Sequence, residues 1–193
     1  DAIKRCAGGA KRGVVVGGGL LGLEAANALR LLGLETHVVE FAPQLMPVQL
    51  DETGGALLRK EVEALGVHIH TGMKTELIDA GEAHALRMNF EGQAPLETDM
   101  IVFSAGIRPQ DSLGRRTGLE LGERGGIVVD NQCRTSDPAI FAIGECALWN
   151  NQIFGLVAPG YTMARTVAAV LNNETADFTG ADMSTKLKLM GVD

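Results

Sequence analysis

The chain has 193 residues, 46% of them hydrophobic, and a formal net charge of −7 at pH 7. This is enough for a buried core in one sizeable domain or two small ones, and the acidic balance argues against a nucleic-acid-binding surface or a basic membrane-facing patch. No apolar run approaches the roughly 20 residues that span a bilayer, and Cys6, Cys133 and Cys146 form no C-x-x-C pair. We therefore expect a globular cytoplasmic protein without nucleic-acid or membrane partners, disulfide framework or zinc site.

The first forty residues alternate between strand and helix patterns. Residues 13–17 are a β-branched run between glycines, which predicts a buried parallel strand. Apolar residues at helical spacing predict a helix over 20–32, and residues 35–41 predict a second strand. The order strand, helix, strand is typical of a sheet with crossover helices.

The next elements continue this alternation and then change to shorter segments. Asp51 is expected to cap a helix that stops at Gly66, and its predicted apolar face comprises Leu57, Leu58, Val62 and Leu65. Residues 66–71 predict a third strand. Residues 75–103 contain short segments separated by glycine and proline turns, which predicts an antiparallel meander that leads into a final strand.

The glycines between the first strand and the first helix have the spacing of a dinucleotide fingerprint. Gly17 permits the tight turn, Gly19 lets a pyrophosphate approach the backbone, and Gly22 lets the helix pack against the strand. Peptide N–H groups at the start of the helix, at Leu20 and Leu21, are then expected to meet the phosphates. The alternative is a glycine-rich turn without a ligand.

The end of the second strand bears on the choice of dinucleotide. Glu40 lies 18 residues past Gly22, the last glycine of the fingerprint, where a carboxylate accepts hydrogen bonds from ribose hydroxyls and repels a 2′-phosphate. This position favours NAD over NADP, the alternative being a solvated glutamate at a strand end. Glu24 lies in the first helical turn, where the helix dipole favours a carboxylate whatever its function.

Three stretches in this order resemble the two-dinucleotide flavoprotein reductases, or pyridine nucleotide-disulfide oxidoreductases. They are "GGGLLGLE" (17–24), "DMIVFSAGIRP" (99–109) and "TSDPAIFAIGE" (135–145). The resemblance implies an α/β fold, in which a Rossmann-like NAD-binding domain with a parallel sheet and a β-meander precedes the second segment of an FAD-binding domain. It places Glu24 near the nicotinamide and adds Gly106, in the hinge-like second stretch, to the cofactor-binding residues.

The implied domain boundaries follow from the same three stretches. The NAD-binding domain is expected over 10–105, the second segment of the FAD-binding domain over 106–178, and a connection to a further C-terminal part over 179–193.

The third stretch also has an interpretation from its residues. "AIFAIG" (139–144) predicts a short buried strand, whose Gly144 lets a ligand approach the backbone, and the carboxylate of Glu145 can bind a ribityl hydroxyl of a flavin. Related proteins usually have Asp at this position, so a water could mediate the contact. Pro159 and Gly160 are expected to precede a helix whose start, by analogy with the family, points at the flavin. The alternative is an ordinary amphipathic helix.

Within the family, residues 125–164 and 181–193 resemble the large subunit of assimilatory-type, pyridine-nucleotide-dependent nitrite reductase. This resemblance implies hydride transfer from NADH to FAD, then electron transfer to iron–sulfur and siroheme centres, in the presence of a small subunit. It also implies that the chain is an internal piece, inactive alone, whose FAD fingerprint and metal centres lie in other parts of the enzyme. No catalytic nucleophile or general base is expected.

Other functions remain open at this point. A ferredoxin or rubredoxin reductase or an NADH oxidase of the same family would share these motifs, and a non-catalytic NAD-sensing module would share the first. His68 and His70 alternate along a strand and are expected to form its polar side, so no metal site is predicted. Lys186 and Lys188 alternate with leucines, as in a strand or an extended tail.

Overall fold

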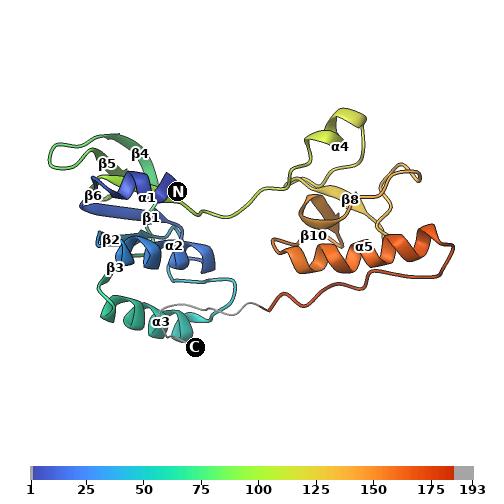
Figure 1. Cartoon of the computed structure of the whole chain (residues 1–193), viewed down its shortest axis with the longest axis horizontal. Coiled ribbons are helices and arrows are strands. Elements are labelled where there is room, and N and C mark those ends of the chain that lie inside the picture. The colour runs from blue at the N-terminus through green and yellow to red at the C-terminus, as the bar shows by residue number, and fades with distance from the viewer. Residues whose placement is uncertain (1, 185–193) are drawn as a thin grey trace. The chain divides into compact units, whose positions relative to one another are not determined.

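A computed structural model describes residues 2–184, which form two compact units. The N-terminal unit ends at Gly106 and the C-terminal unit begins at Ile107 (Figure 1). A short helix that was not predicted, α1 (Ala2–Ala7), opens the chain. None of the helices within residues 2–184 has the length and apolar character needed to cross a membrane.

The N-terminal unit is built on a parallel sheet of four strands. These strands are β1 (Arg12–Val16), β2 (Glu35–Val39), β3 (Val67–His70) and β7 (Met100–Phe103), arranged in the order β3-β2-β1-β7. The three strands predicted before residue 75 and the final strand of the predicted meander are therefore confirmed. The parallel register pairs Val15 with Val38, and Val38 with Ile69, so buried apolar side chains lie side by side across the sheet.

Two helices pack on one face of this sheet. Helix α2 (Leu20–Leu31) follows β1, and α3 (Glu52–Ala64) begins at Asp51, whose carboxylate accepts the Gly54 N–H at 2.8 Å as predicted for a cap. Leu23, Val38 and Val62 are completely buried in the hydrophobic cluster on this side. Leu57 was expected on the apolar face of α3, but its side chain is 61% exposed, so that prediction is wrong. The adjacent Leu58 turns inward in its place.

The predicted meander covers the other face of the sheet. Strands β4 (Thr75–Ala80), β5 (Leu86–Phe90) and β6 (Gln93–Thr98) form a separate antiparallel sheet. Met88 and Phe90 from this sheet pack against Val14 and Val39 in a second hydrophobic cluster. The middle of the parallel sheet is thus covered on both faces, as expected for an apolar strand such as β1, whose Val14 and Val15 belong to the two clusters.

A carboxylate fastens the return of the meander to the parallel sheet. Asp99 lies between β6 and β7 and accepts the backbone N–H groups of Lys11 and Arg12 at 2.8 and 3.0 Å. These bonds, with a side-chain contact from His84, hold the pKa of Asp99 well below its usual range. The ionised carboxylate therefore fixes β7 beside β1.

The C-terminal unit has much shorter elements. They are α4 (Ser112–Thr117), β8 (Ile127–Val129), the 3₁₀ turn η1 (Gly144–Cys146), β9 (Ala147–Trp149), β10 (Gln152–Ile153) and α5 (Val157–Leu171). Strands β8 and β9 are parallel, whereas β9 and β10 form a hairpin. Asn150 and Asn151 form its turn with φ of +47° and +59°, the conformation of a type I′ hairpin. The core contains Phe154, Met163 and Phe178.

Two predictions for the C-terminal unit are wrong. Residues 139–144 form no strand, because their pairing is limited to one isolated bridge between Arg134 and Phe141, and Gly144 then turns the chain with φ +77°. Helix α5 begins at Val157, so Pro159 and Gly160 lie inside its first turn rather than before it. Proline fits there because the first N–H groups of a helix have no intrahelical acceptor.

The chain after α5 returns along the C-terminal unit without helix or strand. Phe178 is fully buried, and Ala181 and Met183 pack against the same core. Of the connection expected over 179–193, only residues 179–184 are described, and the expectation for Lys186 and Lys188 lies outside the described residues.

Candidate nucleotide-binding site

The glycine fingerprint forms a tight crossing of backbones at the carboxyl end of β1. Gly17 has φ +113°, and a Cβ there would overlap the carbonyl oxygen of Ser104, just beyond β7. A Cβ at Gly22 would overlap the carbonyl oxygen of Gly17. Both positions thus require glycine, and the close packing expected at Gly22 is confirmed. This contact holds α2 directly against the end of β1.

Gly19 differs from its neighbours because its surroundings are open. A Cβ at Gly19 would meet no atom within 4 Å, and Gly19 caps α2 without a side-chain hydrogen bond. The N–H groups of Leu20, Leu21 and Gly22, in the first turn of α2, have no acceptor within the helix. Open space beside unpaired N–H groups and a positive helix end is the arrangement that binds phosphate.

Glu40 lies at the neighbouring strand end and faces the same turn. Its carboxylate accepts the Gly18 N–H through one oxygen and the Ala42 N–H, at 2.7 Å, through the other. The structure therefore brings Glu40 together with Gly17, Gly19, Leu20, Leu21 and Gly22. A carboxylate has about four lone-pair positions, so two remain for hydroxyl donors.

Two further predicted residues of the N-terminal unit lie apart from this turn. Glu24 is exposed on α2 one turn beyond its start, not in the first helical turn as expected, and Gly106 is exposed after β7 with φ +87°. Neither residue has a hydrogen bond that ties it to Glu40 or to the fingerprint within the described part of the chain.

The predicted flavin contacts lie in the C-terminal unit, at the start of α5. The Gly144 N–H donates to the sulfur of Met163 at 3.3 Å, and a Cβ at Gly160 would lie 3.2 Å from the Gly144 Cα. A Cβ at Gly144 itself would meet no atom within 4 Å. Glu145 is exposed beside it. Gly144, the exposed Glu145 and the uncapped start of α5 thus lie next to one another.

Sequence reasoning did not predict three contacts that shape these sites. Gly18 donates to Glu40, and a side chain at Gly18 would collide with Glu40 and Leu45. Gly160 and Met163 hold η1 against α5. The run of three glycines at 17–19 was the available signal for Gly18, whereas Gly160 and Met163 depend on a packing contact that has no sequence signature.

The histidines of β3 share one face as predicted, and β2 brings His37 beside them. The rings of His37 and His68 stack with centroids 4.6 Å apart, and His37 Nδ1 lies 3.0 Å from His70 Nε2. His37 Nε2 lies 3.1 Å from the Glu35 carboxylate. Burial, together with the neighbouring His68 and His70, lowers the pKa of His37 to about 4, against the opposing effect of Glu35.

Comparison with known proteins identifies the family. The Pyridine nucleotide-disulphide oxidoreductase family matches residues 2–171 of the chain. The chain belongs to this family. The fold class expected from the resemblance is thereby confirmed, together with the parallel and antiparallel sheets described above.

Individual members of the pyridine nucleotide-disulphide oxidoreductases sharpen the comparison. The large subunit of nitrite reductase [NAD(P)H] from Klebsiella oxytoca is 64% identical over 193 residues, which are 100% of this chain and 20% of that protein. The expected similarity to these subunits is therefore confirmed, and the chain spans about a fifth of the relative's length.

Two solved structures share the arrangement of the chain. An FAD-dependent pyridine nucleotide-disulphide oxidoreductase from Desulfovibrio vulgaris superposes with a TM-score of 0.82 and 35% identity, over 95% of this chain and 48% of its own. A water-forming NADH oxidase from Lactobacillus brevis, bound to NADH, has a TM-score of 0.87 and 25% identity, over 97% of this chain and 42% of its own.

Proposed function

We propose that this chain is the NADH-binding and flavin-contacting part of a nitrite reductase large subunit. The observation that carries the proposal is the 64% identity with the Klebsiella oxytoca subunit along the whole chain. In the intact enzyme, the N-terminal unit would bind NADH and the C-terminal unit would contact FAD.

The N-terminal unit fits NADH in three respects. The open space at Gly19 admits the pyrophosphate, and the first N–H groups of α2 donate to its oxygens. Glu40 has lone pairs left for the ribose hydroxyls, and its charge repels the 2′-phosphate of NADPH. Glu24 and Gly106 are proposed as contacts toward the nicotinamide end. The role of these residues is to bind and orient the nucleotide.

The C-terminal unit fits the flavin end of FAD. The space at Gly144 allows a ring system to approach the backbone, and the exposed Glu145 can accept a hydrogen bond from a ribityl hydroxyl. The positive end of α5 would favour negative charge on a reduced flavin. When bound, FAD would accept hydride from NADH and release electrons singly. No general base from this chain is needed for that exchange, because the protein supplies position and charge.

The metal centres implied by nitrite reduction do not fit this chain. An iron–sulfur cluster of the 4Fe–4S type takes four thiolates, whereas the sequence contains three cysteines, of which Cys6 is exposed and Cys133 buried. We therefore place iron–sulfur and siroheme binding in other parts of the intact enzyme. The small subunit implied by the resemblance is proposed as a partner of that whole enzyme.

The proposal is tested on the complete polypeptide that carries this chain. We expect a yellow protein that oxidises NADH in proportion to added nitrite and forms ammonia. Oxygen-dependent NADH oxidation without a nitrite requirement would favour an NADH oxidase, and electron delivery only to a ferredoxin or rubredoxin would favour a reductase of that class. A colourless complete protein that binds NADH would favour a sensing module. The 193-residue chain alone is expected to bind NADH but to lack stoichiometric FAD.

Glu40 is tested by the ratio of the affinities for NADH and NADPH. Two charge-assisted hydrogen bonds to ribose hydroxyls contribute ~1.5–3 kcal/mol, so Glu40→Ala should reduce the preference for NADH roughly ten- to a hundredfold. The ratio is the appropriate measurement because loss of the bonds to Gly18 and Ala42 affects both nucleotides. Glu61→Ala, at an exposed position of α3, is the matched control. Equal affinities in the unmutated chain would contradict the role assigned to Glu40.

A further inference from the structure

We propose that Glu35, His37 and His68 form a binding site for one divalent metal ion of the zinc class, with His70 holding His37 in position. The site lies on the face of the parallel sheet opposite α2 and α3, where β3 is the edge strand. It does not depend on the proposed nitrite reductase function, because its ligands are not part of the glycine fingerprint.

Strand pairing creates the cluster. His37 on β2 is directly opposite His68 on β3, and Val39 is opposite His70. Glu35 precedes His37 by two residues on the same strand, so both side chains point to the same face. Three of the four histidines of the chain are thus gathered on two neighbouring strands. The sequence alone indicated only the alternation of His68 and His70.

The distances are close to those of a metal site. One ligand atom from each of Glu35, His37 and His68 can be chosen so that all three lie within 4.8 Å of one another. In a tetrahedral zinc site, ligand atoms about 2.0–2.1 Å from the metal lie about 3.3–3.4 Å from one another. The Glu35 and His37 atoms are already 3.1 Å apart, so it is the exposed His68 ring that has to turn toward them to complete the site. Two imidazoles and one carboxylate form a donor set that suits zinc and related ions.

The contacts of His37 leave one of its nitrogens available as a ligand. A neutral imidazole carries one proton, yet His37 Nδ1 faces His70 Nε2 at 3.0 Å and His37 Nε2 faces Glu35 Oε1 at 3.1 Å. When Nδ1–H donates to His70, the Nε2 lone pair and the Glu35 carboxylate point into the same space. A cation there satisfies both, and the bond to His70 fixes the ring as outer partners of metal-bound histidines do.

Arg12 positions the carboxylate. Its guanidinium lies 3.0 Å from both Glu35 oxygens and reaches them from β1, where Arg12 is opposite Glu35. These two contacts hold the carboxylate, in the ionised form that binds metal, beside His37.

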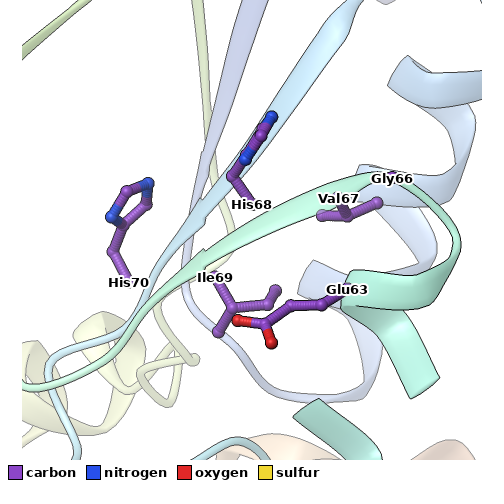
Figure 2. Close-up of a pocket in the computed structure, with 6 residues that line it drawn as sticks. All are labelled: Glu63, Gly66, Val67, His68, Ile69 and His70. Carbon is purple, nitrogen blue, oxygen red and sulfur yellow. The ribbon is translucent and has the colours of Figure 1, made fainter. Parts of the chain in front are cut away.

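The cluster is accessible from solvent. The His37 side chain is 8% exposed and that of Glu35 is 44% exposed, so a metal would rest on a buried ring and be reached from the side of Glu35 and His68. Figure 2 shows His68 and His70 on one side of β3, with Ile69 and Glu63 on the other. A surface hollow of about 300 Å³ lies along β3 and is lined in part by His68 and His70, so both rings are reached from solvent.

Zinc binding to the full 193-residue chain, prepared without a histidine tag, tests the site. The chain should carry Cys6→Ser, because Cys6 is an exposed thiol and thiolates bind zinc independently of the proposed site. Calorimetric titration with ZnCl₂ should give one equivalent bound per chain, and Zn²⁺ should raise the thermal midpoint because it binds the folded state. Co²⁺ should produce visible absorption bands with the same stoichiometry, which identifies coordination by protein side chains.

Two ligand variants and one control distinguish this site from general metal binding. His68→Asn and Glu35→Gln alter partly exposed side chains, and each should weaken zinc binding at least about tenfold. His84→Asn is the matched control, because His84 is the fourth histidine and contacts Asp99 instead of the cluster. Its zinc affinity should be unchanged. Absence of zinc binding in the parent chain, or equal affinity in both ligand variants and the parent, would overturn the proposal.

Discussion

The two units of the chain differ in how they support their binding surfaces. In the N-terminal unit, strands of up to five residues form a parallel sheet with one hydrophobic cluster on each face. In the C-terminal unit, strands of two or three residues share one cluster with α5 and the segment around Phe178. The nucleotide-binding turn therefore lies at the end of a sheet that packs against other elements of its own unit on both faces. The flavin-contacting turn lies against one helix, α5.

Because of this difference, the glycine turn of the N-terminal unit depends on local backbone contacts, whereas the turn at Gly144 in the C-terminal unit depends on the hydrophobic core. The glycine turn is held by backbone contacts between Gly17, Gly22 and Ser104, which a single side chain would disrupt. The flavin-facing turn at Gly144 is held through Met163, which is itself part of the only cluster found in the described residues of that unit. The C-terminal surface should therefore be the more sensitive to loss of core packing.

The largest expected effect is on the C-terminal core. Phe154 is 1% exposed and packs edge-to-face on Phe178, so Phe154→Ala should destabilise this unit by about 3–5 kcal/mol. Because no cluster residue of the N-terminal unit is involved, NADH binding should persist. Calorimetric unfolding with NADH titration of the same samples measures both. Tyr161→Ala, at a position 62% exposed, is the control; loss of NADH binding in Phe154→Ala would show that the units are not independent.

The second expected effect is a loss of stability at low pH that is specific to the N-terminal unit. The pKa of His37 is about 4 when folded and near 6.5 when unfolded. Between these values the unfolded chain binds a proton that the folded chain does not, so stability falls as the pH is lowered from 6.5 to 4. The loss in the N-terminal unit approaches about 3 kcal/mol.

The groups facing His37 are Glu35, with its partner Arg12, and His68 and His70. Burial also lowers the pKa of His70, which acts in the same direction. Denaturant unfolding at pH 7 and 4.5, in the presence of EDTA, should show a smaller loss in His37→Gln than in the parent. An identical loss in both would mean that His37 is not responsible.

The smallest expected effect comes from alanine substitutions in the glycine turn, where one glycine is needed for folding and another for NADH binding. Gly22→Ala forces a Cβ into the Gly17 carbonyl and should cost about 1–3 kcal/mol as well as NADH affinity. Gly19→Ala meets no atom of the chain, so it should leave the thermal midpoint nearly unchanged while still weakening NADH binding. Similar thermal shifts in the two variants, or unaltered NADH affinity in Gly19→Ala, would contradict the assignment of Gly19 to the phosphate contact.

The N-terminal fold was largely predictable because its patterns are long and redundant. The apolar run at 13–17, the helical spacing at 20–32 and the cap at Asp51 each indicate one structure, and each lies where it was expected. The C-terminal unit was less predictable because strands of two or three residues are too short for periodicity. Residues 139–144 have the composition of a strand but pair only through the Arg134–Phe141 bridge.

The sequence by itself determined the dinucleotide fingerprint and the family resemblance, because the glycine spacing at 17–22 lies between a strand pattern and a helix pattern and two further stretches follow it in order. Only the tertiary structure decided that Glu40 accepts the Gly18 N–H and that Glu35, His37 and His68 converge. These contacts join strands that are far apart along the chain. Their alignment follows from the register of β2 on β1 and on β3, which no single segment specifies.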